Sequence, residues 1–412
     1  MNRYTKKIVV DLTPILPGGV NGGAKVFVIE LLKKLIELKS NYFWSFIIRP
    51  GLEKELAFLK NKNTKLVSEQ NLNKIFEPKR LQKFGRVFIK NNPFLPLGII
   101  LLSGKIYRHW IEKKRFKALF LNHYDLLFCP FTAPIYHQKN VPTVSIIYDL
   151  QYKTYPSFFS SEDVAGRNAT FINACEKATR LIAISEYSRQ KAIEHGNLHD
   201  EKVQTIHISL AQRFETHIKN KSLLKQHHLK QNEYFIYPAN FWKHKNHEFL
   251  ITAFQIARTQ GITKEIKLVL TGAPCERQKL LKEMIIKMGL QDTIIFLDYV
   301  SNEELAVLMK NSLALVFPSL YEGFGIPLVE AMALEVPVLC SNVTSLPEIG
   351  GDAVLMFNPK DPLDMAQKFV EIFKSEDLRN QLVEKGKKRR LLFSDLNQMA
   401  EEYLMVFDSV FY

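Results

Sequence analysis

Cysteine is scarce in this sequence, and so are long apolar runs. The 412 residues include four cysteines and no Cys-x-x-Cys pair, which argues against a disulfide framework and a zinc site. The longest apolar stretch, PFLPLGIILLSG at residues 93–104, falls well short of the roughly 20 residues that cross a bilayer. Asp11 interrupts the apolar run near the N-terminus, so we interpret that run as a first β-strand and not as a signal peptide. We expect a cytoplasmic protein.

Several familiar catalytic motifs are also missing. The sequence contains no D-x-D, which would bridge a diphosphate through a metal, and no H-E-x-x-H, which would bind zinc. It also lacks the G-x-S-x-G turn of serine hydrolases and the G-K-[ST] ending of a Walker A loop. His244 and His247 lie three positions apart, but a metal site there is a weaker interpretation than a phosphate site. We therefore predict no metal and no bound cofactor.

The positive charge is concentrated in one part of the chain. The net charge is +14, and residues 1–215 carry 33 Lys and Arg against 18 Asp and Glu. Within them, residues 79–117 hold 11 basic residues and the single acid Glu112, interleaved with apolar side chains. This segment could dock on the anionic cytoplasmic face of the inner membrane, or it could simply be a solvated helical face. Nucleic-acid binding is disfavoured because no nucleic-acid-binding motif accompanies the charge.

Short Val- and Ile-rich runs alternate with segments of helical periodicity along the chain. One series of expected strands includes KIVVDLTPI, SFIIRP, PTVSIIYDL and RLIAIS, and a second includes YFIYPAN, IKLVLTG, TIIFLDYV, LALVFPS and PVLCS. Such alternation is typical of parallel sheets covered by helices on both faces. We predict an α/β protein of two Rossmann-like, doubly wound domains facing across a cleft, 1–215 and 232–394, with a linker near 210–232. Ligands are then expected at the carboxyl ends of the strands.

The first candidate site is the stretch LTPILPGGVNGGAKVF, between an expected strand and an expected helix. Its glycines, which include Gly22 and Gly23, permit close backbone approach, and the N–H groups at a helix start suit a phosphate. A flexible turn explains the same glycines equally well.

The stretch YEGFGIPLVEAM places Glu322 and Glu330 on either side of a glycine-rich turn. We expect Pro327 at the first helical position and Glu330 in the first helical turn, where a carboxylate can accept hydrogen bonds from sugar hydroxyls. Glu330 as a mere complement to the helix dipole would leave the glycines unexplained. A row of backbone N–H groups between the two acids can bind an anion: Gly323, Phe324, Gly325 and Ile326.

Two further stretches supply charge after an expected strand. In YPANFWKHKNHEFL, the cluster that begins at Lys243 and includes Lys245 could neutralise a diphosphate leaving group. In SIIYDLQYKTYP, Asp149 follows a strand end and would face the same cleft, although it could also be a strand cap.

Together these stretches resemble the family 4 glycosyltransferases, which are retaining, nucleotide-sugar-dependent enzymes of the GT-B fold. The resemblance covers nearly the whole chain and is strongest over residues 237–358. It implies metal-independent transfer of a sugar from a nucleotide-diphosphate sugar to a hydroxyl of a glycan or lipid-linked saccharide, in cell-surface polysaccharide synthesis. It also implies that the last helix, within 395–412, packs back on the N-terminal domain.

The resemblance assigns roles to individual residues. Lys245 would contact the donor diphosphate, and Glu330 would bind the ribose of the nucleotide. Glu322 would lie by the donor sugar. The other donor contacts would come from Gly22, Gly23, Asn240, Tyr299, Val300, Gly323, Phe324, Gly325, Ile326 and Pro327.

Glu322, Lys245, Tyr148 and Asp149 are the candidates for catalysis. The family commonly has His at the position of Tyr148, and Tyr can donate a hydrogen bond but cannot carry a positive charge near neutral pH. The family also often has Arg at the position of Asn240, which leaves the lysines to supply the charge. Three other functions stay open: a nucleotide-sugar epimerase of related fold, a non-catalytic nucleotide-sugar binder, and a membrane scaffold.

Overall fold

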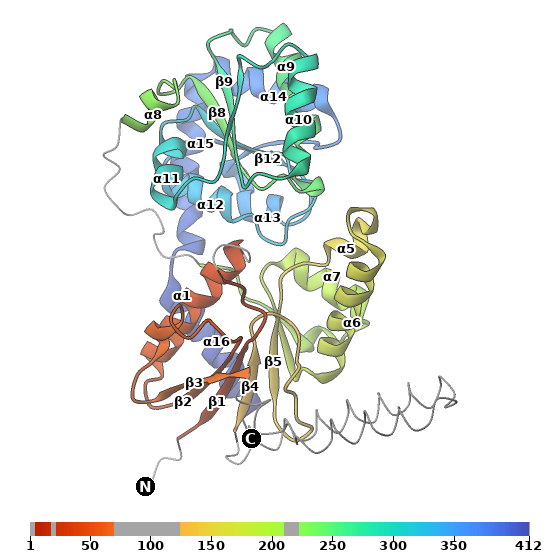
Figure 1. Cartoon of the computed structure of the whole chain (residues 1–412), viewed down its shortest axis with the longest axis vertical. Coiled ribbons are helices and arrows are strands. Elements are labelled where there is room, and N and C mark those ends of the chain that lie inside the picture. Colours follow the sequence, from red (N-terminus) through yellow and green to blue (C-terminus); the bar gives the residue numbers. More distant parts are fainter. Residues whose placement is uncertain (1–4, 18–21, 70–123, 210–221, 412) are drawn as a thin grey trace, which may run out of the picture. The chain divides into compact units, whose positions relative to one another are not determined.

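The computed structural model describes residues 5–17, 22–69, 124–209 and 222–411 (Figure 1). The basic segment 79–117 and residues 210–221 of the expected linker lie outside these ranges. The chain forms two compact units, one of residues 1–146, 170–181 and 400–412, the other of residues 147–169 and 182–399. The boundaries 1–215 and 232–394 stay predictions.

The first sheet has its earliest strand, β1, in its interior, between β2 and β4. Among the described residues its order is β3 (Thr64–Ser68), β2 (Phe43–Ile48), β1 (Lys7–Leu12), β4 (Leu126–Cys129), β5 (Thr143–Ile147), β6 (Arg180–Ala183) and β7 (Val203–Thr205). β1 pairs in parallel with both β2 and β4. The strand order therefore reverses between β1 and β4, which is the switch point where doubly wound sheets bind ligands.

The first unit buries the apolar face of its helices against this sheet. Helix α1 (Gly22–Leu38) turns Phe27, Leu31 and Leu35 inward, a spacing of one helical turn. Helix α16 (Leu396–Val410) contributes Tyr403 and Phe407, whose rings lie edge-on to Phe128 of β4. The end of the chain is thus part of the core of the first unit.

The second sheet repeats this design with six strands in the described chain. Its order is β10 (Ile294–Leu297), β9 (Lys267–Thr271), β8 (Tyr234–Pro238), β11 (Ala314–Phe317), β12 (Val338–Ser341) and β13 (Leu355–Phe357). All neighbours pair in parallel. The switch point of this sheet lies between β8 and β11, and the predicted doubly wound α/β fold is confirmed.

Consecutive residues of β8 show how both faces of the second sheet are covered. Phe235 packs edge-on against Phe254 of α9 (His247–Thr259) and Phe369 of α14 (Pro362–Lys374), and these two helices lie side by side in Figure 1. Tyr234 points to the opposite face, as successive strand residues do, and its hydroxyl donates to the carbonyl of Leu308 in α11 (Asn302–Lys310).

The remaining helices complete the second unit. Its longer helices are α6 (Ser161–Lys177), which crosses between the units, α7 (Glu186–Gly196), α10 (Glu276–Lys287), α12 (Ile326–Ala333) and α15 (Glu376–Arg389). The short elements include α5 (Gln151–Thr154), α8 (Ser222–Gln226), α13 (Leu346–Gly350) and the 3-10 turns η2 (Pro156–Phe158), η4 (Lys243–Lys245) and η6 (Arg390–Phe393). No helix within the described ranges is long and apolar enough to cross a membrane.

Candidate functional site

Two loops meet at the switch point of the second sheet. The Lys245 loop, residues 239–246, connects β8 to α9, and the Glu322 loop, residues 318–325, connects β11 to α12. Since β8 and β11 are neighbours and parallel, both loops emerge from the same edge of the sheet. The pairing of the strands therefore places the candidate residues Lys245 and Glu322 beside each other.

Backbone and amide hydrogen bonds tie the two loops together. Asn246 adopts a left-handed conformation, with φ +62°. Its side-chain amide donates to the carbonyls of Pro318, at 3.1 Å, and Pro359, at 2.8 Å. The backbone N–H of Leu320 donates to the carbonyl of His244 at 2.8 Å. These hydrogen bonds hold the Lys245 loop and the Glu322 loop in a fixed position relative to each other.

Lys245 and Glu322 form a largely buried ion pair. The ammonium nitrogen of Lys245 lies 2.6 Å from Oε1 of Glu322, and each side chain is 14% exposed. Burial alone would raise the pKa of Glu322, but the charge of Lys245, together with hydrogen bonds, holds it below its ordinary value. The carboxylate is therefore ionised at neutral pH, and it holds the lysine at the carboxyl ends of the strands.

The histidines of the Lys245 loop do not add positive charge. Burial, together with the charge of Lys245, lowers the pKa of His244 to about 4. Burial, together with the charges of Arg277 and Lys245, lowers the pKa of His247 to about 3. His247 lies between the rings of Tyr237 and Phe241, each about 4.9 Å away. The cluster is thus cationic through its lysines alone. Within the described ranges, no group of three or more His, Cys, Asp or Glu could hold a metal ion.

The Glu322 loop turns into α12 through a glycine that needs its freedom. Gly325 has φ +105° and precedes the first helical residue, a conformation that side chains disfavour. Two details differ from the sequence prediction. The helix starts directly after Gly325, so Ile326 is its first residue and Pro327 its second. Glu330 consequently lies beyond the first helical turn, and its side chain is buried.

Gly323 packs against the backbone of Tyr148 and the side chain of Asp149, the two other catalytic candidates. A Cβ on Gly323 would lie 2.2 Å from the carbonyl oxygen of Tyr148 and 3.2 Å from Cβ of Asp149. Burial raises the pKa of Asp149, and the charge of Glu322 adds to that rise while Arg167 and Lys245 oppose it. The second unit therefore brings together Lys245, Glu322 and Asp149, with Tyr148 adjacent. Burial also raises the pKa of the Tyr148 hydroxyl.

Asp149 also has a structural contact. Its Oδ1 accepts the backbone N–H of Gln151 at 3.0 Å, at the start of α5. The bond leaves the second carboxylate oxygen for other contacts, and the alternative of a strand cap stays open.

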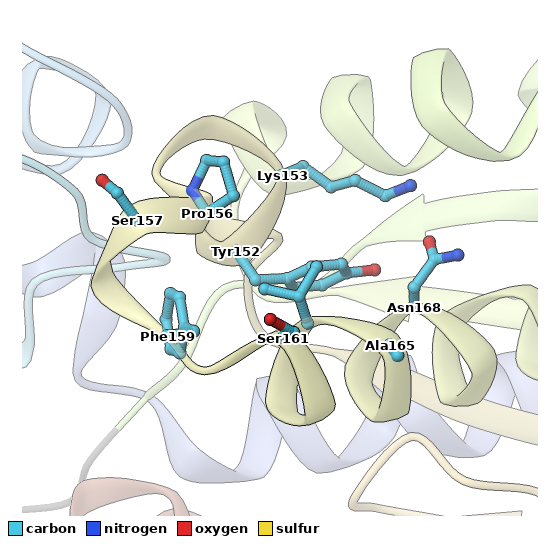
Figure 2. A pocket seen from close by; sticks show the side chains of 9 residues that line it. Tyr152, Lys153, Pro156, Ser157, Phe159, Ser161, Ala165 and Asn168 are labelled. Carbon is cyan, nitrogen blue, oxygen red and sulfur yellow. The ribbon is translucent and has the colours of Figure 1, made fainter.

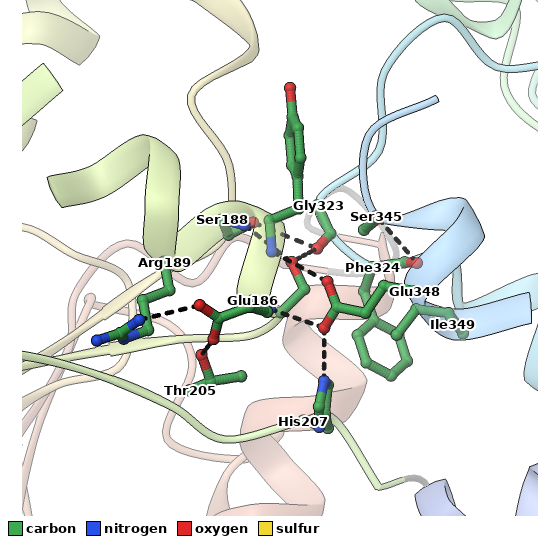
Figure 3. Close-up of polar contacts among 12 residues, drawn as sticks. Glu186, Ser188, Arg189, Thr205, His207, Gly323, Phe324, Ser345, Glu348 and Ile349 are labelled. Carbon is green, nitrogen blue, oxygen red and sulfur yellow. Dashed lines mark hydrogen bonds and ion pairs between the residues drawn. The ribbon is translucent and has the colours of Figure 1, made fainter. Parts of the chain in front are cut away.

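A polar network, shown in part in Figure 3, contacts the Glu322 loop at Gly323 and Phe324. Ser185, the N-cap of α7, donates from its hydroxyl to the carbonyl of Gly323 at 2.7 Å. Ser188 donates to the carbonyl of Tyr148 at 3.0 Å. Ser345 lies 3.0 Å from the carbonyls of both Glu322 and Phe324. The carbonyls of this loop are thereby engaged.

Glu348 of α13 completes the network at the start of α7. Its carboxylate accepts the N–H groups of Glu186, at 2.7 Å, and Tyr187, at 3.0 Å, and lies 2.6 Å from Nε2 of His207. Burial opposes ionisation, but these hydrogen bonds hold the pKa of Glu348 below its ordinary value. The helix N-terminus is thus neutralised by a side chain of the protein itself.

The other predicted residues are more dispersed. Asn240 is exposed, and its Oδ1 accepts the N–H of Ala273 at 3.2 Å. Tyr299 is 73% exposed in the turn that follows β10, with Val300 next to it. Gly22 opens α1 with φ +54°, and Gly23 follows it in the first unit.

Sequence reasoning missed the residues that support the Glu322 loop. Ser185 had a local signal, since a Ser before a helix is a typical N-cap. Ser188 lies inside that helix and had no such signal. Glu348 and His207 had none, because each pairs with residues far away in the sequence.

Comparison with solved structures identifies the architecture. The chain is similar to the HepE protein of Anabaena in complex with UDP and glucose, at 17% identity and TM-score 0.68, over 98% of this chain and 100% of that one. It is also similar to WaaG, a glycosyltransferase involved in lipopolysaccharide biosynthesis, at 14% identity and TM-score 0.65, over 96% and 98%. The fold is that of the GT-B glycosyltransferases, as predicted.

Sequence comparison adds a match within the second unit. Residues 219–389 match the family described as glycosyl transferases group 1. It is 29% identical to O-antigen chain mannosyltransferase B of Escherichia coli, over 55% of this chain and 62% of that protein. It is 30% identical to O-antigen chain mannosyltransferase RfbU of Salmonella typhimurium, over 45% and 48%. The matches thus span about half to three fifths of these two relatives.

Proposed function

We propose that this protein is a retaining glycosyltransferase that moves mannose from a nucleotide-diphosphate sugar to a hydroxyl of a growing saccharide in surface polysaccharide assembly. The buried pair of Lys245 and Glu322 at the switch point of the second sheet is the observation that carries this proposal. The names of the two O-antigen mannosyltransferases support the choice of sugar and acceptor class.

The pair is suited to a leaving group that gains negative charge. The departing nucleoside diphosphate needs a fixed cation, and Lys245 cannot drift because Glu322 and the surrounding loops hold it. Such preorganised charge stabilises a transition state more than a mobile surface charge does. The backbone N–H groups at the start of α12 would share the phosphate charge, so the reaction would need no metal.

The proposed transfer keeps the configuration at the anomeric carbon. The acceptor oxygen forms its bond to that carbon on the face from which the diphosphate departs. The carbon–oxygen bond to the phosphate breaks, and the acceptor proton passes to the departing phosphate oxygen. Glu322 and Asp149 would orient the hydroxyls of the donor sugar, and Glu330 would hold the ribose.

A panel of nucleotide sugars tests the proposal, with thermal stability as the first measurement. We expect a GDP- or UDP-linked hexose to raise the melting temperature and to be transferred to a mannoside with retained configuration, as judged by NMR of the first product. Inverted product would exclude the retaining mechanism. Interconversion of donors without an acceptor would identify an epimerase, and no stabilisation by any donor would contradict the proposal.

The role of Glu330 has its own test. Replacement by Ala removes the hydrogen-bond acceptor for the ribose, so we expect donor affinity to fall about tenfold, the size of one strong hydrogen bond. Isothermal titration with the donor measures this. Unchanged affinity in a folded variant would remove Glu330 from the donor site.

Membrane docking through residues 79–117 is part of the proposal for the acceptor. The support is the charge of this segment, which lies outside the described residues. Flotation with vesicles of neutral lipid, or of neutral lipid mixed with anionic lipid, is the test. Binding that does not depend on anionic lipid would contradict it.

A further inference from the structure

The second unit contains a cavity that the proposed donor site does not use. Its volume is about 720 Å³, within the roughly 300–1,000 Å³ of typical ligand pockets. It lies between α5, η2 and α6 (Figure 2). The side chains that line it include Tyr152, Lys153, Pro156, Ser157, Phe159, Ser161 and Asn168.

The lining defines the chemistry of a ligand. Lys153 is the one charged side chain among the lining residues, and the others offer hydroxyls, an amide and apolar surface. A nucleoside diphosphate would need more cations than this. A saccharide fits better, because its hydroxyls need donors and acceptors while the C–H face of its ring packs on aromatic and proline side chains.

Two residues of or beside the cavity are suited to hydrogen bonding and stacking with a saccharide. Asn168 lines the cavity. Its Oδ1 has no hydrogen-bond partner among the described residues and is covered by protein atoms, so a rotation of the side chain amide would bring it to a ligand hydroxyl. The ring of Phe159 is held from one side by Arg167, whose guanidinium carbon lies 4.8 Å from the ring centroid. Figure 2 shows Asn168 and Lys153 at one end of the cavity and Phe159 and Pro156 at the other.

The cavity is close to the proposed reacting centre. Tyr152 follows Asp149 by three positions, a span that cannot exceed roughly 11 Å even in an extended chain. The next aromatic residue, Tyr155, lies edge-on to Tyr321, which precedes Glu322, with ring centroids 6.4 Å apart. Sugar residues joined to the reacting one can bridge such a distance.

We propose that this cavity is an acceptor subsite for the sugar residues next to the one that receives the transferred mannose. The proposal rests on the proposed function. It assigns Phe159 to stacking and Asn168 to hydroxyl recognition, and it makes the protein selective for an acceptor that is already a chain.

The test compares acceptors of increasing length. Methyl α-mannoside and the corresponding di- and trisaccharides are offered to the wild type, Phe159→Ala and Asn168→Ala, with Asn173→Ala as the control. Asn173 lies on the same helix and does not line the cavity. The readouts are kcat/KM for each acceptor, donor hydrolysis without acceptor, and the donor-induced shift in melting temperature.

We expect the wild type to prefer the longer acceptors. Phe159→Ala and Asn168→Ala should each lose about tenfold in kcat/KM with the longer acceptors, the scale of one lost contact, and less than twofold with the monosaccharide. Donor hydrolysis and Asn173→Ala should be unaffected.

The outcomes separate this proposal from the one on which it rests. A wild type without length preference, or variants that keep it, would overturn the subsite while donor hydrolysis still supports the transferase. A wild type that neither binds nor hydrolyses any nucleotide sugar would overturn the proposed function and the subsite with it.

Discussion

Asp11 lies near the carboxyl end of β1 in the first sheet, and Glu322 lies in the loop that follows β11 in the second sheet, yet their surroundings differ. Glu322 has a lysine at 2.6 Å and a lowered pKa. Asp11 is 1% exposed, its Oδ1 accepts the N–H and hydroxyl of Thr13, and burial raises its pKa to about 6. Its Oδ2 has no hydrogen-bond partner within the described ranges.

The two carboxylates differ in whether a neighbouring cation compensates their charge. In the second sheet a buried carboxylate is matched by a cation, so that both charges are available to a ligand at neutral pH. In the first sheet the carboxylate is charged at neutral pH against the preference of its surroundings, which costs stability. Topology alone therefore does not decide which switch point would carry the proposed phosphate chemistry.

Removing the cation of the matched pair should have the largest effect. We expect Lys245→Gln to lower kcat/KM for transfer about 10²- to 10³-fold, the loss typical of one preorganised charge. Lys243→Gln is the matched control, because Lys243 is exposed in the same turn, and we expect it to lose less than tenfold. Steady-state kinetics measure both, and equal losses would refute a special role for the buried pair.

Displacing the Glu322 loop should have the next largest effect. Gly323→Ala puts a Cβ 2.2 Å from the carbonyl oxygen of Tyr148, so the loop must move, and a shift of about 1 Å can cost about 10²-fold in rate. Gly166→Ala on α6 is the control, because a Cβ there meets no atom within 4 Å. A Gly323→Ala variant with normal turnover would show that the loop position is not critical.

Neutralising the unmatched acid should change the pH dependence of stability. A folded-state pKa of about 6 against 3.8 unfolded means that stability falls as pH rises through this interval, by about 3 kcal/mol in total. The Asp11→Asn variant lacks this fall, because Asn does not titrate. The free energy of unfolding of the wild type, minus that of the variant, should therefore decrease between pH 4 and pH 7. Denaturant titrations at both pH values measure it, and parallel pH profiles would contradict it.

Glu348→Gln should have the smallest effect. The variant keeps one acceptor oxygen but loses the charge at the N-terminus of α7, which we expect to cost about 1–2 kcal/mol of stability. Because the folded-state pKa of Glu348 is lowered, this contribution is present at neutral pH and is lost as pH falls through that pKa.

The exposed Asp352, four residues further on, is the control for Glu348. Its ion pair with Lys385 lies on the surface, and Asp352→Asn should change stability by no more than about 0.5 kcal/mol. Equal losses in the two variants, by thermal unfolding at neutral pH, would argue against a special role for the helix N-terminus.

The sequence predicted most of the secondary structure because local patterns encode it. The stretches YFIYPAN and IKLVLTG were expected as strands, and they form β8 and β9. The position of the switch point was not predicted, because it depends on which strands pair.

What the sequence could not predict depends on burial and on distant contacts. The neutral state of His244 and His247 follows from the side chains around them, which no local pattern reveals. Glu348 contacts the start of α7, 162 positions earlier in the chain at Glu186. The ion pair of Lys245 with Glu322 spans 77 positions, and the roles of both residues in binding stay predictions.

Position 246 should tolerate very few amino acids when the sequence of this protein is varied. Its left-handed backbone admits few residues other than Gly, Asn and Asp, and its amide donates to the carbonyls of two different loops. Replacing Asn246 by Asp would place carboxylate oxygens against the carbonyl oxygens of Pro318 and Pro359, so that acceptors would face acceptors. Replacing it by Gly would leave both carbonyls without a hydrogen-bond donor. In a saturation library that scores folded protein, position 246 should therefore retain a single amino acid, even though its side chain is assigned no contact with a substrate.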